Sequence, residues 1–166
     1  MTKEPLPGRG KERQLTTVER RIEAPVEQVF GTLADPWLIP VWVVGATHIR
    51  NVDAEWPAPH SRIHHQVGAW PLSISDSTAV VRYEEPSVLV LQGRAWPIGE
   101  VRIELTVQPD GAGSLVRMGE APTYGTARIL DNPLQRKLLA ARNRESLARL
   151  AAVAENRRPV PAMPQR

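Results

Sequence analysis

Apolar and polar residues alternate with a period of two through most of the chain between residues 15 and 121. Segment 100–108 is the clearest case, because Val, Ile and Leu fill one set of alternate positions and charged residues or Thr mainly fill the other. Successive side chains of a strand point to opposite faces, so the pattern predicts strands with one apolar and one solvated face. We expect seven of them, with a bulge near 75–77 in the fourth. They cover residues 15–23, 47–52, 62–70, 72–84, 87–96, 100–108 and 114–121.

Helical spacing replaces this alternation in three places. Apolar residues three or four positions apart predict a short amphipathic helix over 25–34. A second short helical piece follows it and is limited in length by Pro40. The last helix is long: Asn132 can cap it, Pro133 can open it, and one apolar stripe continues to about residue 156.

The order of these elements predicts an α+β fold in which an antiparallel sheet is covered on one side by a long C-terminal helix. Seven strands about 4.8 Å apart make a face wider than one helix about 10 Å across can cover. The remaining space must be filled by large side chains, by a partner or by a ligand cavity.

Composition indicates one globular domain, since the 166 residues are 42% hydrophobic and 23% charged. We expect this domain over 15–156, between disordered tails at 1–14 and 157–166. The chain has no cysteine, which excludes disulfides, thiolate metal sites and a cysteine nucleophile. No apolar run approaches the roughly 20 residues of a membrane span, and the N-terminus lacks a signal-peptide pattern. We therefore expect a cytoplasmic protein.

Positive charge is concentrated near the C-terminus. Residues 128–158 carry eight Lys or Arg and three Asp or Glu, whereas residues 15–127 carry eight and thirteen. Clustered arginines attract phosphates, but the same pattern also describes the solvated face of a helix. The solvated face is the simpler interpretation, and we do not expect nucleic acid as a partner.

Five stretches carry a resemblance that spans about 15–156. They are VERRIEAPVEQVF from residue 18, LADPW from residue 33 with Trp42 following, RIHHQVGAWPL from residue 62, AWPIGE from residue 95, and the Leu-rich last helix. In order and spacing they resemble the START-like helix-grip (SRPBCC) superfamily, in its polyketide cyclase/dehydrase and lipid-transport branch. The resemblance implies a curved sheet gripping the C-terminal helix, with a cavity between them suited to an apolar or aromatic molecule.

Three candidate ligand contacts stand out for their position. His65 alternates with apolar neighbours on the inner face of its strand, and Asn143 lies in the middle of the apolar stripe of the last helix. Trp42 lies on the short helical piece that gates the cavity mouth in the family. Each has a structural alternative: a hydrogen-bonded core histidine, an amide bonded to the sheet backbone, or an indole packed in the core.

Two further candidates depend on which strand faces point inward. Tyr83 occupies the same alternate positions as Val81, and Glu120 the same as Met118. If those faces point inward, both side chains reach the cavity, where a buried hydroxyl or carboxylate needs a partner.

Four histidines do not form a metal site by local geometry. His64 and His65 point to opposite faces of one strand, and His60 would lie about 13 Å from His64 if that strand continued. A cross-strand site with His48 stays a minor alternative. We expect no metal and no cofactor.

Three functions remain open. The first is binding of a lipid-like or polyketide-like molecule through Trp42, His65, Tyr83, Glu120 and Asn143. The second is a cofactor-free cyclase or dehydratase, which needs only positioned polar groups in such a cavity. The third is a module that docks a protein or nucleic acid on the Arg-rich helix. A homodimer is compatible with each of them.

Overall fold

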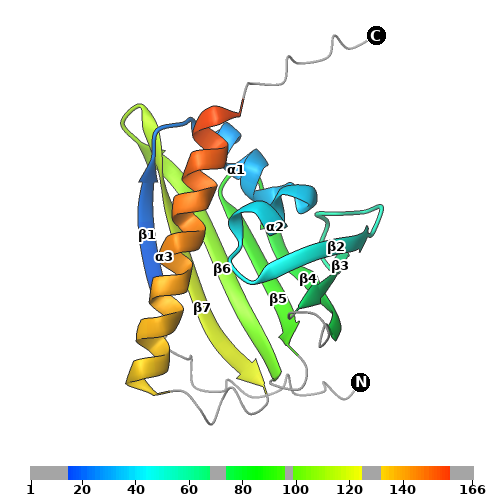
Figure 1. Ribbon diagram of the computed structural model, residues 1–166. Helices are drawn as coiled ribbons and strands as arrows, with labels where there is room; N and C mark the ends of the chain where they lie inside the picture. The colour runs from blue at the N-terminus through cyan, green and yellow to red at the C-terminus, as the bar shows by residue number, and fades with distance from the viewer. Residues whose placement is uncertain (1–14, 68–73, 96–98, 125–131, 158–166) are drawn as a thin grey trace, which may run out of the picture.

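The computed structural model describes residues 15–67, 74–95, 99–124 and 132–157, and its elements follow the predicted order (Figure 1). The predicted tail 1–14, nearly all of the C-terminal tail, and the strand ends at 68–70, 72–73 and 96 lie outside the described residues. The elements are β1 (Thr16–Ile22), α1 (Val26–Ala34), the 3-10 turn η1 (Pro36–Leu38), α2 (Ile39–Trp42), β2 (Ala46–Val52), β3 (Arg62–Val67), β4 (Ile74–Glu84), β5 (Val88–Ala95), β6 (Gly99–Asp110), β7 (Gly113–Tyr124) and α3 (Pro133–Asn156).

The strands form one antiparallel seven-stranded sheet in the order β1-β7-β6-β5-β4-β3-β2. The sheet curves around α3, which confirms the predicted helix-grip fold (Figure 1). Consecutive strands from β2 to β7 are neighbours in the sheet, and β1 pairs with β7 on its other side. The two edge strands are therefore β1 and β2, and β2 carries two register shifts along its pairing with β3.

Helix α3 begins as its sequence predicts. The Asn132 side chain accepts a hydrogen bond from the Gln135 backbone N–H at 2.9 Å, and Pro133 lies in the first turn, where no N–H is required. The helix packs against β1, β7, α1 and α2. Its buried residues are Asn143, Ser146, Leu147, Leu150, Ala151 and Ala154.

The packed core lies at the end of the sheet covered by α1, which we call the α1 end. Val29, Phe30 and Leu33 of α1 are at most 1% exposed, and they meet an equally buried sheet floor. Burial of one such side chain stabilises the fold by about 1.5–3 kcal/mol. The floor residues include Leu89, Leu105, Val107 and Val116.

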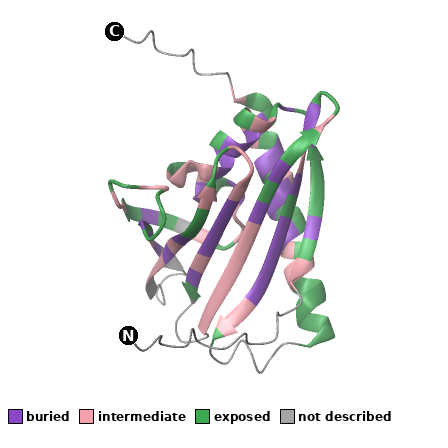
Figure 2. Cartoon of the chain, turned by 180° about the vertical axis from the view of Figure 1, so that it is seen from behind, coloured by how far each residue is buried: buried purple, intermediate pink, exposed green. Residues whose placement is uncertain are grey.

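Burial decreases toward the opposite end of the sheet, which we call the far end. On the inner face of β6, Leu105 and Val107 are 1% and 2% exposed, but Ile103 and Val101 are only half-buried. Figure 2 shows the same change, as β6 is pink along its first half. The helical layer therefore fills the α1 end and leaves the inner face at the far end less tightly covered.

Two local predictions were wrong. The bulge of β4 lies between Val80 and Arg82, not at 75–77, where pairing with β3 is regular. The extra residue comes where β4 has passed the end of β3 and pairs with β5 alone, so one neighbouring ladder fewer fixes its register. Pro40 does not limit the second helical piece: it lies in the first turn of α2, where its missing N–H leaves no bond unmade.

Candidate functional site

Cross-strand pairing places one charged side chain in an apolar row across the inner face. Val80, Leu91, Ile103 and Glu120 are successive partners on β4, β5, β6 and β7. Directly opposed residues project on the same side of a sheet, so Glu120 shares the interior with three apolar side chains. It is only 4% exposed.

Helix α3 supplies the partners of this carboxylate. Arg142 forms an ion pair with Glu120 through Nη2, and its Nε and Nη2 also donate to Asn143 Oδ1 at 3.2 and 3.0 Å. The Arg142 side chain is 39% exposed, so it spans from solvent to the buried carboxylate. Asn143 is fully buried. The three residues make a polar cluster where α3 crosses β7, which we call the Glu120 cluster.

Burial raises the pKa of Glu120 above its ordinary value. The Arg142 charge acts in the opposite direction and offsets part of this increase, and the Asn143 amide near the carboxylate adds to that effect, although Asn143 Nδ2 does not reach hydrogen-bonding geometry with a described residue. The carboxyl group therefore keeps its proton to a higher pH than an exposed glutamate does.

A second polar pair lies on β3 and β4. His65 is 8% exposed, and its Nε2 lies 2.9 Å from Thr78 Oγ1, which is equally buried. Burial is the largest influence on His65 and lowers its pKa, while Asp76 raises it. The ring is therefore neutral at physiological pH. The His65 side chain points into the interior, as the alternation along its strand predicted. The neighbouring His64 is half-buried and lies 3.1 Å from Asp53.

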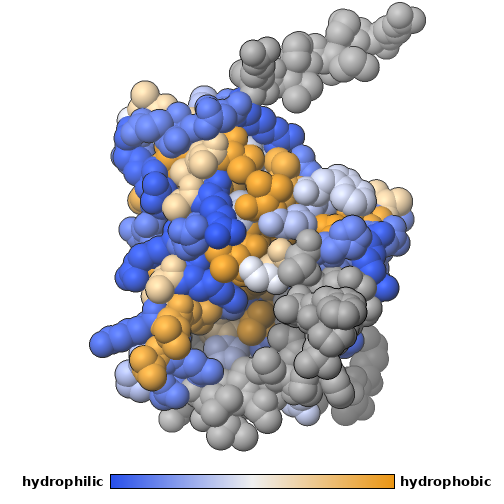
Figure 3. Space-filling view, in the orientation of Figure 1, coloured by the Kyte–Doolittle hydropathy of each residue, from blue (hydrophilic) through white to orange (hydrophobic). Residues whose placement is uncertain are grey.

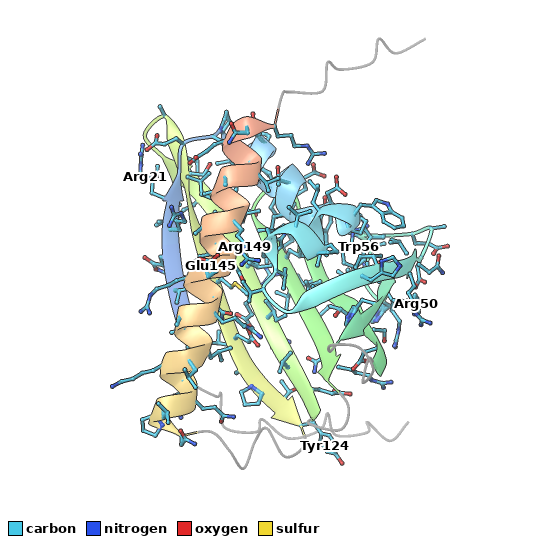
Figure 4. The ribbon with its side chains drawn as sticks, viewed as in Figure 1. Arg21, Arg50, Trp56, Tyr124, Glu145 and Arg149 are labelled. Carbon is cyan, nitrogen blue, oxygen red and sulfur yellow. The ribbon has the colours of Figure 1, made fainter. Side chains whose placement is uncertain are left out.

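Trp42 is buried among core residues, and its indole N–H has no hydrogen-bond partner among the described residues. Trp56 provides the contrast, because its Nε1 donates to the Ala34 carbonyl at 2.8 Å and so ties the loop before β3 to α1 (Figure 4). The indole N–H of Trp56 therefore has a structural role, whereas the indole N–H of Trp42 makes no hydrogen bond with a described residue.

Tyr83 lies apart from these groups. The β4 bulge moves it off the face of Val81, which is 41% exposed, and its ring packs on Phe30 with centroids 5.5 Å apart. Its hydroxyl donates to Glu85 at 3.1 Å, and burial is the main reason why its pKa rises to about 12. Tyr83 thus belongs to the α1 end, and its hydroxyl points to the β4–β5 turn.

Three buried side-chain nitrogens lack a hydrogen-bond partner among the described residues: Trp42 Nε1, His65 Nδ1 and Asn143 Nδ2. They come from α2, β3 and α3, the elements around the apolar interior. All three belong to residues selected from sequence as ligand contacts. Buried polar groups are nearly always bonded, so these three exceptions need a physical explanation.

Sequence reasoning missed Arg142 and Thr78. By helical periodicity Arg142 falls on the flank of the apolar stripe, and only the length of its side chain brings it to Glu120. The demand of a buried carboxylate for a positive partner was the signal that could have found it. Thr78 carries no comparable signal, because a threonine in a strand is ordinary.

Apolar surface is visible between α3 and β2. Figure 3 shows orange side chains receding there into a hollow, bordered by the blue outer face of α3. Within the described ranges, no three His, Asp or Glu side chains gather as metal ligands. Nor is any described helix long and apolar enough to cross a membrane.

Comparison with known proteins gives a consistent result. The model of the family "Polyketide cyclase / dehydrase and lipid transport" matches residues 13–155. No curated protein is significantly similar in sequence. A solved structure from Rhodobacter sphaeroides superposes with a TM-score of 0.67 at 19% identity, covering 84% of this chain and 90% of that one.

Two other solved structures are similar over most of this chain. CalU16 from Micromonospora echinospora has a TM-score of 0.58 at 18% identity, over 87% of this chain and 76% of that one. DynU16, described as a protein of the dynemicin biosynthetic locus, has a TM-score of 0.63 at 14% identity over 86% of this chain. The match spans only 47% of DynU16. At these identities the likeness concerns the fold.

Proposed function

Because the chain belongs to the polyketide cyclase/dehydrase and lipid-transport family, we propose that it binds a small apolar or aromatic molecule between the inner face of the sheet and α3. The observation that carries this proposal is the set of three unpartnered buried nitrogens on Trp42, His65 and Asn143. Each buried donor lowers the stability of the fold by about 1–3 kcal/mol when it makes no hydrogen bond. Ligand oxygens that pair with them would recover that free energy.

The chemistry of the donors defines the ligand. An indole N–H only donates, and an amide NH₂ only donates, so Trp42 and Asn143 select acceptors such as carbonyl, phenol or carboxylate oxygens. His65 Nδ1 donates or accepts, depending on its tautomer. Apolar residues between these groups favour a hydrocarbon or aromatic body. A polyketide-like molecule or an oxygenated lipid combines both features.

A second function has its own support in the same interior. Burial shifts the pKa of Glu120 upward and that of His65 downward, so a carboxyl group that keeps its proton to a higher pH than usual and a neutral imidazole lie on one inner face. Such a pair supplies a general acid and a general base without a cofactor. Cyclisation by carbanion attack on a carbonyl, followed by loss of water, needs those two groups.

The arginines of α3 give less support to the third function, docking of a protein or nucleic acid. Arg149 pairs with Glu145 on the outer side of α3 (Figure 4), Arg142 with Glu120, and Arg157 with Asp35. Arginines engaged with acidic partners of their own chain present little net positive charge. We therefore assign them to the fold.

Two measurements test the proposal. Native mass spectrometry of protein purified from its own host should detect a retained organic molecule. Fluorescence titration with anthracene carboxylate should show saturable binding that changes little with salt, since cavity contacts release few counterions. Steep loss of affinity with salt would instead indicate docking of a polyanion such as nucleic acid. Absence of saturable binding together with absence of a retained molecule would overturn the proposal, and conversion of a bound polyketone would favour the cyclase.

A further inference from the structure

One side chain is missing from the inner face beside the Val80–Glu120 row. Gly93 of β5 pairs with Thr78 on β4 and with Val101 on β6. It continues the alternate positions of Leu89 and Leu91, both of which are buried in the interior. A side chain at residue 93 would therefore project into the same space.

The backbone at this position does not call for glycine. Gly93 lies inside a regular strand and is not among the residues with positive φ, which are Gly45, His60, Gly99 and Gly111. Glycine inside a strand weakens it, because it adds chain entropy and packs no side chain. Its presence here points to a need for space above the strand.

A Cβ at Gly93 would meet only its neighbours in the sheet. The nearest described atoms would be Val101 Cγ2 at 3.3 Å, Thr78 Oγ1 at 3.5 Å and the Val101 carbonyl oxygen at 4.0 Å. No described atom of a helix comes as near. A methyl group is thus tight but tolerable at the sides, whereas a longer side chain must extend into the interior.

Gly93 also lies between the two polar groups of the interior. Thr78 is one strand away on β4 and its partner His65 is two strands away on β3, while the Glu120 cluster is two strands away in the other direction. Three strand spacings separate β4, which carries Thr78, from β7, and this is about 14 Å along the sheet; His65 lies one spacing beyond, on β3. The floor between them consists of Gly93 and the apolar side chains of Leu91, Val101 and Ile103.

We propose that Gly93 is a specificity-determining residue, which leaves room for a flat, elongated molecule to lie across β4–β7 with a hydrogen-bonding oxygen at each end. One end meets Arg142 and Asn143 at β7, and the other reaches the His65–Thr78 pair at β4. This inference rests on the proposed function and adds the shape and the two-ended polarity of the ligand. A compact ligand with one polar end occupies the Glu120 cluster alone and does not cross Gly93.

The test compares two probes against Gly93→Ala and Gly93→Val. The short probe is naphthalene carboxylate, and the long probe is anthracene carboxylate with a hydroxyl group at the opposite end. We expect Gly93→Val to weaken the long probe by about tenfold, equivalent to about 1.4 kcal/mol, and to change the short probe less than about twofold, with Gly93→Ala in between. The matched control is Gly31→Ala on the exposed side of α1, where an added Cβ meets nothing within 4 Å; both probes should bind it as they bind the wild type.

The possible failures are distinct. Binding of the long probe that is unchanged in folded Gly93→Val would overturn the role of Gly93, as would an equal loss for both probes. If Gly93→Val does not fold, as judged by its melting transition, Gly93→Ala decides by the same comparison. If the wild type binds neither probe, the proposed function itself fails, and the inference fails with it.

Discussion

Replacement of Asn143 by leucine distinguishes a ligand contact from a structural residue. The side chain is fully buried, its Oδ1 accepts two bonds from Arg142, and its Nδ2 has no partner among the described residues. A residue kept for the fold would have both ends bonded. Asn143 has one end bonded to a half-exposed arginine that water can solvate in its place.

The expected stability change follows from these contacts. Leucine removes a buried donor that has no partner, which stabilises the fold by about 1–3 kcal/mol. It also removes two hydrogen bonds from the Arg142 guanidinium, each worth about 1.5–3 kcal/mol, but water can replace them at this exposed group. Since leucine resembles asparagine in length and adds apolar burial, we expect Asn143→Leu to remain within about 1 kcal/mol of the wild type. For a chain of this size that corresponds to a shift in melting temperature of about 2–4 °C.

The assay pairs unfolding with binding. Urea unfolding gives the free energy, and titration with the aromatic carboxylate probe should show an affinity about tenfold lower, the effect of one lost hydrogen bond to ligand. The control is Ser146→Ala, one turn further along α3. Ser146 Oγ accepts the Val44 backbone N–H at 3.1 Å, so its loss should destabilise the fold and leave binding unchanged. Destabilisation of Asn143→Leu by more than about 3 kcal/mol would refute the reasoning, as would unaltered affinity.

Three further predictions concern charge. Because folding raises the pKa of Glu120, its contribution to stability is present in acid and is lost as pH rises above about 4.5. Urea unfolding at a series of pH values should show that Glu120→Gln weakens this loss of stability with pH. An unchanged dependence of stability on pH would count against the prediction. Because the pKa of His65 is lowered, stability should fall as pH drops below 6.5, and His65→Gln should remove that fall when the two proteins are titrated side by side. Arg142→Gln leaves the buried carboxylate unpaired and should destabilise the protein at neutral pH by about 1–3 kcal/mol; adding Glu120→Gln should restore most of it, and simple addition of the two losses in thermal melts would contradict the pairing.

The sequence predicted the fold well because its signals were local. The alternation within β6 and the Asn132-Pro133 start of α3 depend on neighbouring residues and on no distant contact. The site was predicted in part for the opposite reason. Arg142 reaches Glu120 only through the arrangement of α3 over β7, and the orientation of Tyr83 depends on one extra residue in β4. A single-residue insertion reverses every later side chain, and nothing in the sequence around Val81 marks it.

The two edge strands bear on self-association. A free edge offers unpaired backbone groups that another chain can extend into a continuous sheet, the first step toward fibrils. Here Arg21 on β1 and Arg50 on β2 are exposed charged side chains at opposite edges (Figure 4), and the register shifts of β2 distort its outer backbone. Both features oppose such growth. A homodimer of this chain is accordingly expected to meet through faces or helices rather than by joining its sheets.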